Sequence, residues 1–254
     1  MTDLSVAIIT RNEADNIAAC VGSVAFADDI VVVDSGSSDQ TVAIATGLGC
    51  RVFHNPWPGF ARQKQFAVDR CLHDWVLVLD ADERIPHETA EAVTGLLGSA
   101  DVQAVGMSLL RKNYFHGRWM RRCGWWPDRV LRVVNRKKGR FSDHAVHESW
   151  QTDGPVIDLN LAIDHTSFRC YSDLVDKMER YSSLAAAEKF AAGETAAWWT
   201  PIAHGLWMFI QCYGIKGGIL AGFDGFMISL FNAQGSFMKY AKLRERRLHG
   251  DIGS

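Results

Sequence analysis

Short apolar runs alternate with helix-like stretches along the first 110 residues. Three runs, 4–9 (L-S-V-A-I-I), 30–33 (I-V-V-V) and 75–79 (W-V-L-V-L), are mainly bulky and apolar, as in strands buried on both faces. Stretches with helical character, such as 42–48, lie between them. This alternation predicts an α/β domain whose mostly parallel sheet is flanked by helices.

Polar residues follow each apolar run directly. The tetrapeptide T-R-N-E follows the first run, Asp34 follows the second, and the D-A-D of residues 80–82 follows the third. Carboxyl ends of parallel strands meet at one edge of a sheet, where open α/β sheets bind ligands. Mg²⁺ takes one or two carboxylates together with substrate phosphates, so D-A-D is a candidate metal site. Helix capping is the alternative for these acids, above all for Asp39 in the loop after Asp34.

Four sequence blocks occur in a fixed order over the first third of the chain. They are S-V-A-I-I-T-R-N-E (5–13), V-V-V-D-S-G-S-S-D-Q-T (31–41), G-F-A-R-Q-K-Q-F-A (59–67) and W-V-L-V-L-D-A-D-E (75–83). Their order and spacing resemble the family 2 glycosyltransferases, which have the GT-A fold. The resemblance implies a sugar-nucleotide donor site formed by Thr10, Arg11, Asn12, Glu13, Asp34, Asp39, Arg62, Lys64, Asp80 and Ala81.

The same resemblance implies a Mg²⁺ or Mn²⁺ ion held by Asp80 and Asp82. His165, at the end of a later apolar stretch, is a further candidate contact for the diphosphate or the metal. The third block has Ala-Arg-Gln where the family usually has Ala-Arg-Asn. This departure leaves open whether Arg62 or Lys64 approaches the diphosphate.

Basic residues are concentrated between Arg111 and Arg140, where Asp128 is the sole acid and aromatic residues are interleaved. Such a segment can bind RNA, anionic lipid or a phosphorylated sugar acceptor, or form a solvated loop. The net charge of −2 gives no general electrostatic case for nucleic acid. With the donor blocks upstream, we expect acceptor and membrane contacts, with acceptor candidates Trp126, Arg129 and Arg132.

The segment D-H-A-V-H-E (143–148) is the candidate for proton transfer. Inverting glycosyl transfer requires a carboxylate that accepts the proton of the attacking hydroxyl. Glu148 matches the place where the family carries this base, Asp143 is the second candidate, and His147 is expected to orient the carboxylate or the acceptor. A zinc site is the alternative for the two histidines, but the spacing supplies no third ligand.

The C-terminal third is helical and apolar in character. Residues 173–192 are predicted to form an amphipathic helix. Residues 196–215 carry no formal charge, but a proline and polar residues interrupt them, and a basic tail lies at 239–247. These features favour helices that lie on an anionic leaflet, pack on the catalytic domain or form an oligomer interface, over a bilayer span.

Two C-terminal blocks, G-G-I-L-A-G-F-D-G (217–225) and F-M-K-Y-A-K-L (237–243), extend the resemblance over nearly the whole chain. They are similar to the subgroup that builds the lipopolysaccharide inner core, typified by enzymes that add β-1,4-linked glucose to a heptose. The implied function is inverting, metal-dependent transfer of a hexose, glucose by this resemblance, from a UDP-sugar to a heptose of the lipopolysaccharide or lipooligosaccharide inner core. The alternatives are another sugar with a different envelope glycan or lipid acceptor, and an inactive membrane scaffold.

The domain prediction divides the chain at residue 170. Residues 1–170 form the catalytic domain, with a donor nucleotide half (1–110) and an acceptor and catalytic half (111–170), and residues 171–254 form a helical region. The six scattered cysteines contain no C-x-x-C pair, and no basic and apolar leader opens the chain. We therefore expect a cytoplasmic protein, peripheral on the cytoplasmic face of the inner membrane, with a lipid-anchored acceptor and no nucleic-acid partner. A homo-oligomer remains open.

Overall fold

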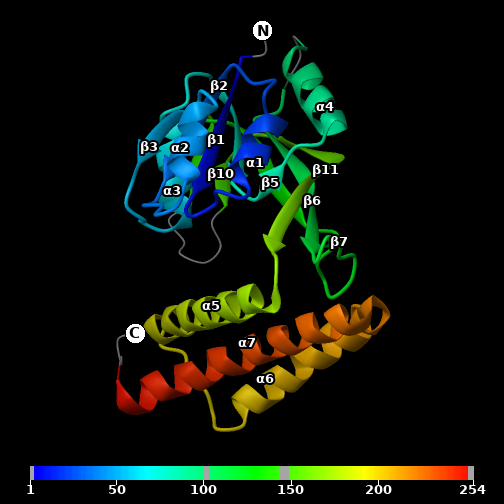
Figure 1. Ribbon diagram of the computed structural model, residues 1–254. Helices are drawn as coiled ribbons and strands as arrows, with labels where there is room; N and C mark the ends of the chain where they lie inside the picture. The colour runs from blue at the N-terminus through cyan, green and yellow to red at the C-terminus, as the bar shows by residue number, and fades with distance from the viewer. Residues whose placement is uncertain (1–2, 100–102, 143–148, 251–254) are drawn as a thin grey trace. The chain divides into compact units, whose positions relative to one another are not determined.

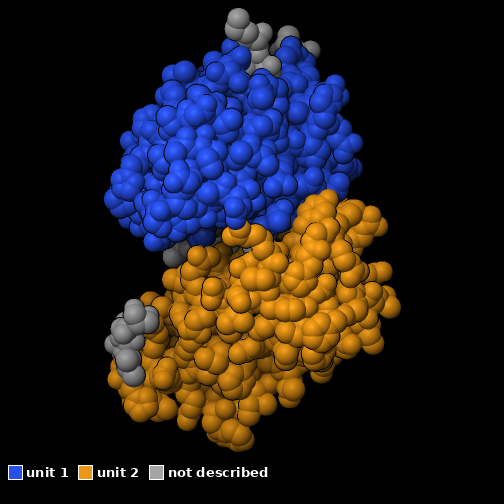
Figure 2. Space-filling view, viewed as in Figure 1, with its two compact units in different colours: residues 1–112, 128–166 blue, residues 113–127, 167–254 orange. Residues whose placement is uncertain are grey.

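The computed structural model describes residues 3–99, 103–142 and 149–250, and of Ser167 only the backbone. The chain forms two compact units, unit 1 with residues 1–112 and 128–166, and unit 2 with residues 113–127 and 167–254 (Figure 2). Residues 113–127 group with the C-terminal helices, and the predicted division of the chain at residue 170 stays a prediction.

Most strands belong to one mixed sheet, whose order is β3-β2-β1-β4-β8-β6-β11-β5, with β7 paired to β6 and β9 paired to β10 in a separate ribbon (Figure 1). The strands are β1 (Leu4–Thr10), β2 (Asp29–Asp34), β3 (Arg51–His54), β4 (Trp75–Asp80), β5 (Glu83–Arg84), β6 (Gly106–Phe115), β7 (Arg118–Trp119), β8 (Arg129–Asn135), β9 (Gly139–Phe141), β10 (Trp150–Thr152) and β11 (Val156–Phe168).

The parallel arrangement predicted by the alternating pattern holds for the first four strands. β1 pairs in parallel with β2 and β4, and β2 pairs in parallel with β3. β8 pairs antiparallel with β4 and with β6, and β11 pairs antiparallel with β5. No helix lies in the connection from β6 to β8, and antiparallel neighbours need no helical crossover. The predicted α/β class with a large sheet flanked by helices is therefore confirmed, and the sheet is mixed.

Unit 1 has an apolar core on both faces of the sheet. Its helices are α1 (Ile17–Ser23), α2 (Thr41–Gly47), α3 (Phe60–Asp69) and α4 (His87–Leu97). Successive side chains of a strand point to opposite faces. Accordingly Val6 and Ile8 of β1 join the cluster that includes residues of α1, α2 and α4, whereas Ala7 and Ile9 join the cluster that includes α3. Burial on both faces explains why residues 4–9 do not alternate between apolar and polar side chains. It also agrees with the place of β1 between β2 and β4 in the parallel half of the sheet.

Unit 2 is built mainly of helices that pack on one long helix. They are α5 (Tyr171–Ala191), α6 (Thr200–Phe209), the π-helical turn η1 (Ile210–Ile215), the 3₁₀ turn η2 (Gly218–Ala221) and α7 (Gly222–His249). Both α5 and α6 pack along α7 (Figure 1). The start of α7 depends on Gly225, where an added Cβ would lie 2.0 Å from the Gly218 oxygen. The amphipathic helix predicted at 173–192 is present as α5.

Within the described ranges, no single helix is long and apolar enough to cross a membrane. One bent pair, 200–215 with 218–249, meets the length and composition criteria together, with a bend of 64° at the break. The criteria concern length and composition alone.

Candidate active site

The parallel strands bring the polar strand ends of unit 1 together. Thr10 of β1 is the register partner of Asp34 on β2, and Ile9 is the partner of Asp80 on β4. The backbone continues the pairing beyond the strands, because Ser35 N donates to Thr10 O at 3.0 Å and Ala81 N donates to Ile9 O at 3.2 Å. The residues predicted from three separate runs therefore lie along one edge of the sheet.

Asp34 organises the loop that follows β2. Its Oδ2 accepts hydrogen bonds from the backbone N of Gly36 at 2.8 Å and of Ser37 at 2.9 Å, and the Ser37 hydroxyl donates to its Oδ1 at 2.5 Å. The carboxylate is only 3% exposed. An ionised carboxylate has about four acceptor positions, so most of those of Asp34 are used within its own loop.

Asn12 ties the loop after β1 to the loop after β2. Its Oδ1 accepts a hydrogen bond from Ser38 N at 2.8 Å, and its backbone N donates to the Ser37 hydroxyl at 2.8 Å. The backbone of Asn12 is left-handed, with a φ of 53°, a conformation in which asparagine is enriched. The two loops thus form one hydrogen-bonded unit at the carboxyl edge.

Asp39 is held at the start of α2. Its Oδ1 accepts from the Thr41 backbone N at 3.0 Å and from the Thr41 hydroxyl at 2.5 Å, and its Oδ2 accepts from Ala14 N at 3.1 Å. The hydrogen bond from the Thr41 hydroxyl is the main cause that lowers the pKa of Asp39. Thr41 also accepts from Glu13 N at 2.8 Å. This geometry agrees with the helix-start interpretation of Asp39, and its donor role stays a prediction.

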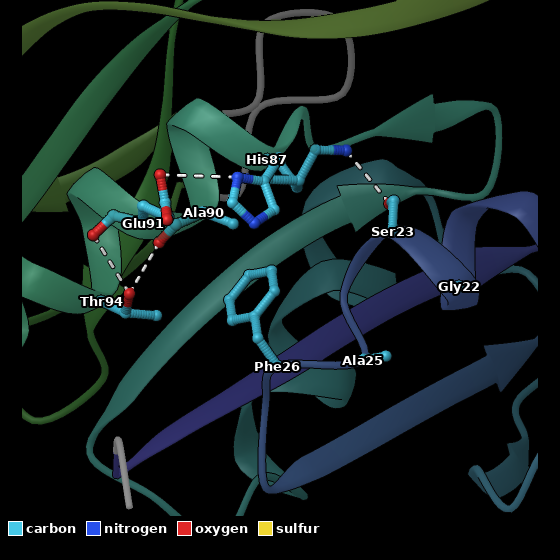
Figure 3. A pocket seen from close by; sticks show the side chains of 9 residues that line it. Gly22, Ser23, Ala25, Phe26, His87, Ala90, Glu91 and Thr94 are labelled. Carbon is cyan, nitrogen blue, oxygen red and sulfur yellow. Dashed lines mark hydrogen bonds and ion pairs between the residues drawn. The ribbon is translucent and has the colours of Figure 1, made fainter.

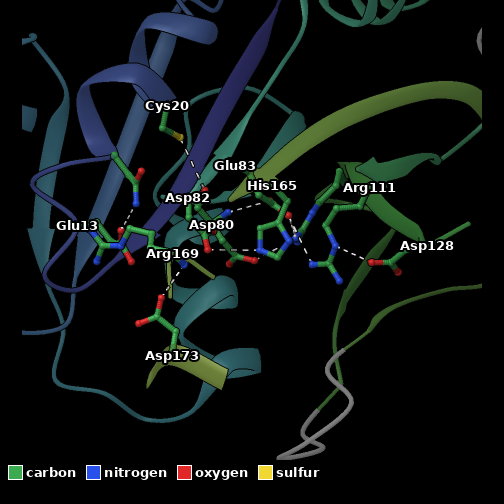
Figure 4. Close-up of polar contacts among 12 residues, drawn as sticks. Glu13, Cys20, Asp80, Asp82, Glu83, Arg111, Asp128, His165, Arg169 and Asp173 are labelled. Carbon is green, nitrogen blue, oxygen red and sulfur yellow. Dashed lines mark hydrogen bonds and ion pairs between the residues drawn. The ribbon is translucent and has the colours of Figure 1, made fainter. Parts of the chain in front are cut away.

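Asp80 is the most strongly held acid of the edge (Figure 4). Lys64 Nζ lies 3.2 Å from Asp80 Oδ1, and Arg132 Nη2 lies 3.0 Å from Asp80 Oδ2. Burial alone would raise the pKa of Asp80, but the charges of Lys64 and Arg132 outweigh it and hold that pKa well below its usual range. Asp80 is thus ionised at every physiological pH.

A buried cluster of charged side chains holds Asp80 in place. Glu83 is fully buried and accepts from Asp80 N at 3.0 Å and from Arg132 Nη2 at 2.5 Å. Arg111 Nη1 lies 3.6 Å from Glu83 Oε1, and Arg111 Nε donates to Asp128 Oδ2 at 2.9 Å. Burial lowers the pKa of Arg132, but the facing carboxylates of Glu83 and Asp80 raise it further than burial lowers it. The cluster fixes the orientation of Asp80 from three elements.

The structure gives Arg132 a different role from the predicted acceptor contact. Its side chain is 6% exposed and is engaged by Asp80 and Glu83, so it holds the acidic edge rather than presenting a free guanidinium. Arg129 is exposed and donates to the Ser108 hydroxyl at 3.2 Å and to Leu159 O at 3.0 Å. Trp126 belongs to unit 2, where its ring packs edge-on against Trp119 at 4.9 Å. The three acceptor candidates are thus divided between the two units.

Lys64 and Arg62 lie on different sides of α3. Lys64 is buried and pairs with Asp80, whereas Arg62 is exposed. Between them Gln63 is fully buried and donates to the Ser35 hydroxyl at 3.0 Å, while its Oε1 accepts from Asn55 at 2.7 Å. The glutamine that departs from the family pattern therefore joins α3 to the loop after β2. Which of the two cations approaches the diphosphate stays a prediction.

Asp82 and His165 form the second part of the acidic edge. His165 Nε2 lies 3.4 Å from Asp82 Oδ2, and the side chains are 8% and 20% exposed, respectively. β11 brings them together, because His165 is the register partner of Glu83 on β5 and Thr166 N donates to Asp82 O at 3.0 Å. Throughout the described ranges, no group of three or more His, Cys, Asp or Glu residues is arranged to hold a metal.

Sequence reasoning assigned no role to Glu83 or Arg111. Glu83 directly follows D-A-D in the chain, and that adjacency was the available signal. Its pairing with Arg132, which lies 49 residues further on, required the tertiary structure. The base candidates Glu148 and Asp143, together with His147, lie outside the described residues.

Unit 1 also has a surface pocket of about 380 Å³ (Figure 3). Residues of α1, α4 and their adjoining loops line it, among them Ser23, Phe26, His87 and Glu91. His87 and Glu91, one turn apart on α4, form an exposed ion pair with Nδ1 and Oε2 3.4 Å apart. None of the predicted donor or metal residues lines this pocket.

Comparisons with known proteins identify the family of the chain. The family model described as glycosyl transferase family 2 matches residues 5–151, more than half of the chain. A protein of Rickettsia felis called an uncharacterized glycosyltransferase is 32% identical over 98% of this chain and 92% of its own length. The lipopolysaccharide core biosynthesis glycosyltransferase LpsC of Rhizobium meliloti is 31% identical over 96% of this chain and 92% of its own length.

Among solved structures, residues 1–349 of TarS from S. aureus match with a TM-score of 0.46 and 14% identity over 99% of this chain and 93% of that one. Glucosyl-3-phosphoglycerate synthase of Mycobacterium tuberculosis, solved with Mn²⁺, UDP and phosphoglyceric acid, matches with a TM-score of 0.34 and 26% identity over 45% of this chain and 43% of that one. The family match and the two relatives show that this chain belongs to glycosyl transferase family 2, and the mixed sheet flanked by helices confirms the predicted GT-A class of fold.

Proposed function

We propose that this family 2 glycosyltransferase transfers glucose from UDP-glucose to a heptose of the lipopolysaccharide or lipooligosaccharide inner core. The observation that carries the donor site is Asp80, fixed between Lys64 and Arg132 beside the Asp82–His165 pair. For the acceptor, the support is the relative from R. meliloti that is named for lipopolysaccharide core biosynthesis. Another sugar, with a different envelope glycan or lipid acceptor, is the alternative.

A buried hydroxyl at the edge supports a ligand there. Within the described part of the chain, Thr10 Oγ1 is buried and has no hydrogen-bond partner. A buried polar atom that forms no hydrogen bond costs about 1–3 kcal/mol. A hydroxyl or amide group of a sugar nucleotide would satisfy this atom, and we assign the nucleoside and ribose to this part of the edge, between Thr10–Glu13, Asp34 and Asp80.

The acids of the edge support a divalent cation. Lys64 and Arg132 contact Asp80, whereas Asp82 faces His165 at 3.4 Å. A diphosphate would bring further negative charge to this edge. A Mg²⁺ or Mn²⁺ ion bound with the donor would offset the charges of Asp82 and the diphosphate and stabilise the charge that develops on the leaving diphosphate.

The residues present fit such an ion through Asp82 and His165. Two ligands at right angles, each about 2.1 Å from a small divalent ion, lie about 3 Å apart. The observed Nε2 to Oδ2 distance of 3.4 Å is close to this spacing. Mg²⁺ is usually bound by one or two carboxylates together with substrate phosphates, and Asp82 is a carboxylate that the edge offers for this role.

On the family resemblance, Glu148 is the proposed general base that accepts the proton of the acceptor hydroxyl, and Asp143 is the alternative base. The carboxylate takes the proton while the hydroxyl oxygen bonds to the anomeric carbon. The bond from that carbon to the diphosphate oxygen breaks, and UDP leaves with its electron pair. Attack opposite the leaving group inverts the anomeric configuration.

The test is calorimetric titration of the full chain with UDP, UDP-glucose, GDP-mannose and dTDP-glucose, each with and without Mn²⁺. Metal-dependent binding restricted to the uridine compounds would support the donor assignment. Asp82→Ala should remove the metal dependence, whereas the surface control Asp153→Ala should leave it unchanged. Binding of no nucleotide, or equal binding in the presence of a chelator, would refute the proposed donor site.

The acceptor is tested separately, by transfer of labelled glucose to lipooligosaccharide that ends in heptose. A matched acceptor whose heptose already carries the glucose should not be labelled. Equal labelling of both acceptors, or labelling of neither while UDP-glucose is hydrolysed slowly to glucose and UDP, would contradict the heptose assignment and leave the donor site intact.

A further inference from the structure

The outward face of α6 and of the turns after it is apolar. We define this apolar ridge by Trp199, Leu206, Ile210, Ile215, Leu220 and Phe223, whose side chains are between 53% and 71% exposed. The first three recur at helical spacing on α6 and the start of η1, and the others lie from the end of η1 to the first turn of α7. Large exposed apolar side chains gathered on neighbouring turns usually mark an interaction site.

Small residues occupy the inner face of α6, which is the reverse of the usual arrangement. Pro201 and Gly205 are buried, and an added Cβ at Gly205 would lie 3.2 Å from the Phe237 Cβ on α7. A helix of a water-soluble domain normally buries its large apolar residues and exposes polar ones. α6 instead packs closely on α7 through small residues and leaves its large side chains outside.

A cationic rim lies beside the apolar ridge. Arg121, Arg122 and Lys216 are exposed, and Cys123 N donates to Lys216 O at 3.0 Å, which joins the two segments. The Arg122 side chain packs over Gly217 and the Lys216 side chain packs over Gly124. These crossed contacts hold both cations next to the exposed turn of residues 215–223.

Asp224, the acid that follows the exposed turn in the chain, already has partners within unit 2. Residues 113–127 and 200–223 contain no Asp or Glu. Asp224, which is 13% exposed, accepts from the Tyr171 hydroxyl at 2.8 Å, and its carboxylate lies 3.1 Å from His116 Nδ1 and 3.9 Å from Arg118 Nη1. The rim therefore presents positive charge to a partner.

We propose that the apolar ridge docks on the surface of a membrane that contains anionic lipid, with α6 in the interface and the cationic rim among the lipid phosphates. Charge complementarity selects this partner, because large apolar and tryptophan side chains beside exposed cations match the boundary between anionic headgroups and acyl chains. α6 and η1 together extend about 24 Å at 1.5 Å per residue, and no single described helix meets the criteria for a membrane span. The proposal rests on the proposed function in one respect: a lipid-anchored acceptor lies at a membrane, so the enzyme would have to meet it there.

The test is flotation of the full chain with vesicles of phosphatidylethanolamine and phosphatidylglycerol, compared with vesicles of phosphatidylcholine alone. The protein should float with the anionic vesicles, and added salt should weaken this binding because it screens the headgroup charge. Absence of flotation with the anionic vesicles, or equal flotation with both kinds at all salt concentrations, would overturn the proposal.

Two paired substitutions test the surface itself. Lys216→Gln with Arg122→Gln should reduce partitioning about 25-fold, since each cation near an anionic surface contributes about five-fold. Lys137→Gln with Lys138→Gln, two exposed lysines of unit 1, should have no such effect. Leu220→Ser with Phe223→Ser should abolish flotation, whereas Leu72→Ser with Leu48→Ser, exposed leucines of unit 1, should preserve it.

Calorimetric binding of UDP distinguishes this proposal from the proposed function. The ridge variants should bind UDP as the wild type does, which also shows that unit 1 is folded, and circular dichroism should show unchanged helix content. A ridge variant that floats normally would refute the docking surface. A wild-type dimer in light scattering that depends on Leu220 and Phe223, without vesicle binding, would replace the membrane by a second copy of the chain. Vesicle-bound protein that resists extraction at high pH would indicate insertion instead.

Discussion

Removal of Arg132 tests whether the buried ion cluster fixes the acidic edge. Arg132→Met keeps a long side chain but removes the charge that lies 2.5 Å from Glu83 and 3.0 Å from Asp80. Removing one partner of a buried ion pair costs about 3–5 kcal/mol of unfolding free energy, because the remaining charge is left without compensation. Lys64 still contacts Asp80 and Arg111 still lies near Glu83, so we expect the lower end, about 3 kcal/mol.

For a chain of this length, a loss of about 3 kcal/mol corresponds to a Tm lowered by about 6–12 °C. Urea unfolding and thermal scans of the full chain would measure both quantities. The matched control is Arg129→Met, on the same strand but exposed. Its ion pair with Asp158, 3.7 Å from the guanidinium, lies at the surface and should contribute less than about 1 kcal/mol.

The difference in unfolding free energy between the wild type and Arg132→Met should also depend on pH. In the wild type the pKa of Asp80 is lowered on folding, although burial opposes this, because Lys64 and Arg132 stabilise the carboxylate. The stability contributed by Asp80 is therefore complete above about pH 5 and declines as the pH falls below the unfolded pKa of about 3.9. Arg132→Met reduces this contribution, so the gap to wild type should be constant above about pH 5 and narrow in acid. Equal stability of the Arg132→Met and Arg129→Met variants, or a gap that widens in acid, would refute the argument.

Three further predictions concern single carboxylates. Asp82→Ala should lose Mn²⁺-dependent binding of UDP-glucose in calorimetry, because it removes the carboxylate that faces His165 in the proposed metal site. Glu148→Gln should bind UDP-glucose as the wild type does while kcat falls at least about 100-fold, the lower range of general base catalysis. Asp29→Asn should lower the unfolding free energy by about 2 kcal/mol in urea titrations, because its hydrogen bonds from Ser5, Arg51 and Leu72 are weakened. UDP binding should persist in this variant, since these contacts lie at the amino ends of β1 and β2.

Each of these results has a contrary outcome. Equal loss of donor binding in the Asp82 and Glu148 variants would refute the separation of donor and base roles, and Asp153→Ala serves as the surface control for both. Burial raises the pKa of Asp29, but the hydrogen bond from Arg51 leads the contacts that lower it overall. Its stabilisation should therefore be present above the unfolded pKa of about 3.9 and decline in acid. A wild-type-like Asp29→Asn variant near pH 7 would contradict this account.

The local sequence was sufficient for the parallel half of the sheet. The run I-V-V-V followed by Asp34 predicts both a strand buried on two faces and the position of its polar end, because burial and strand length are local properties. The four blocks also carried enough of the family pattern to identify the glycosyltransferase class. The order of strands after β4 did not follow from the same pattern, because antiparallel pairing of β6 with β8 depends on a connection that has no helical periodicity.

Residue identity and strand position determined which groups reach the carboxyl edge of the sheet, and only the tertiary structure decided how they are paired. Lys64 and Arg62 lie two residues apart and both carry a positive charge, yet packing of α3 buries Lys64 on Asp80 and exposes Arg62. Arg132 was one cation among many in a basic segment, and β8 places it between Asp80 and Glu83. The same holds for the apolar ridge, whose composition is evident in the sequence. Its exposure follows from the close contact of α6 with α7, because a side chain's partners are set by neighbours that are distant in the chain.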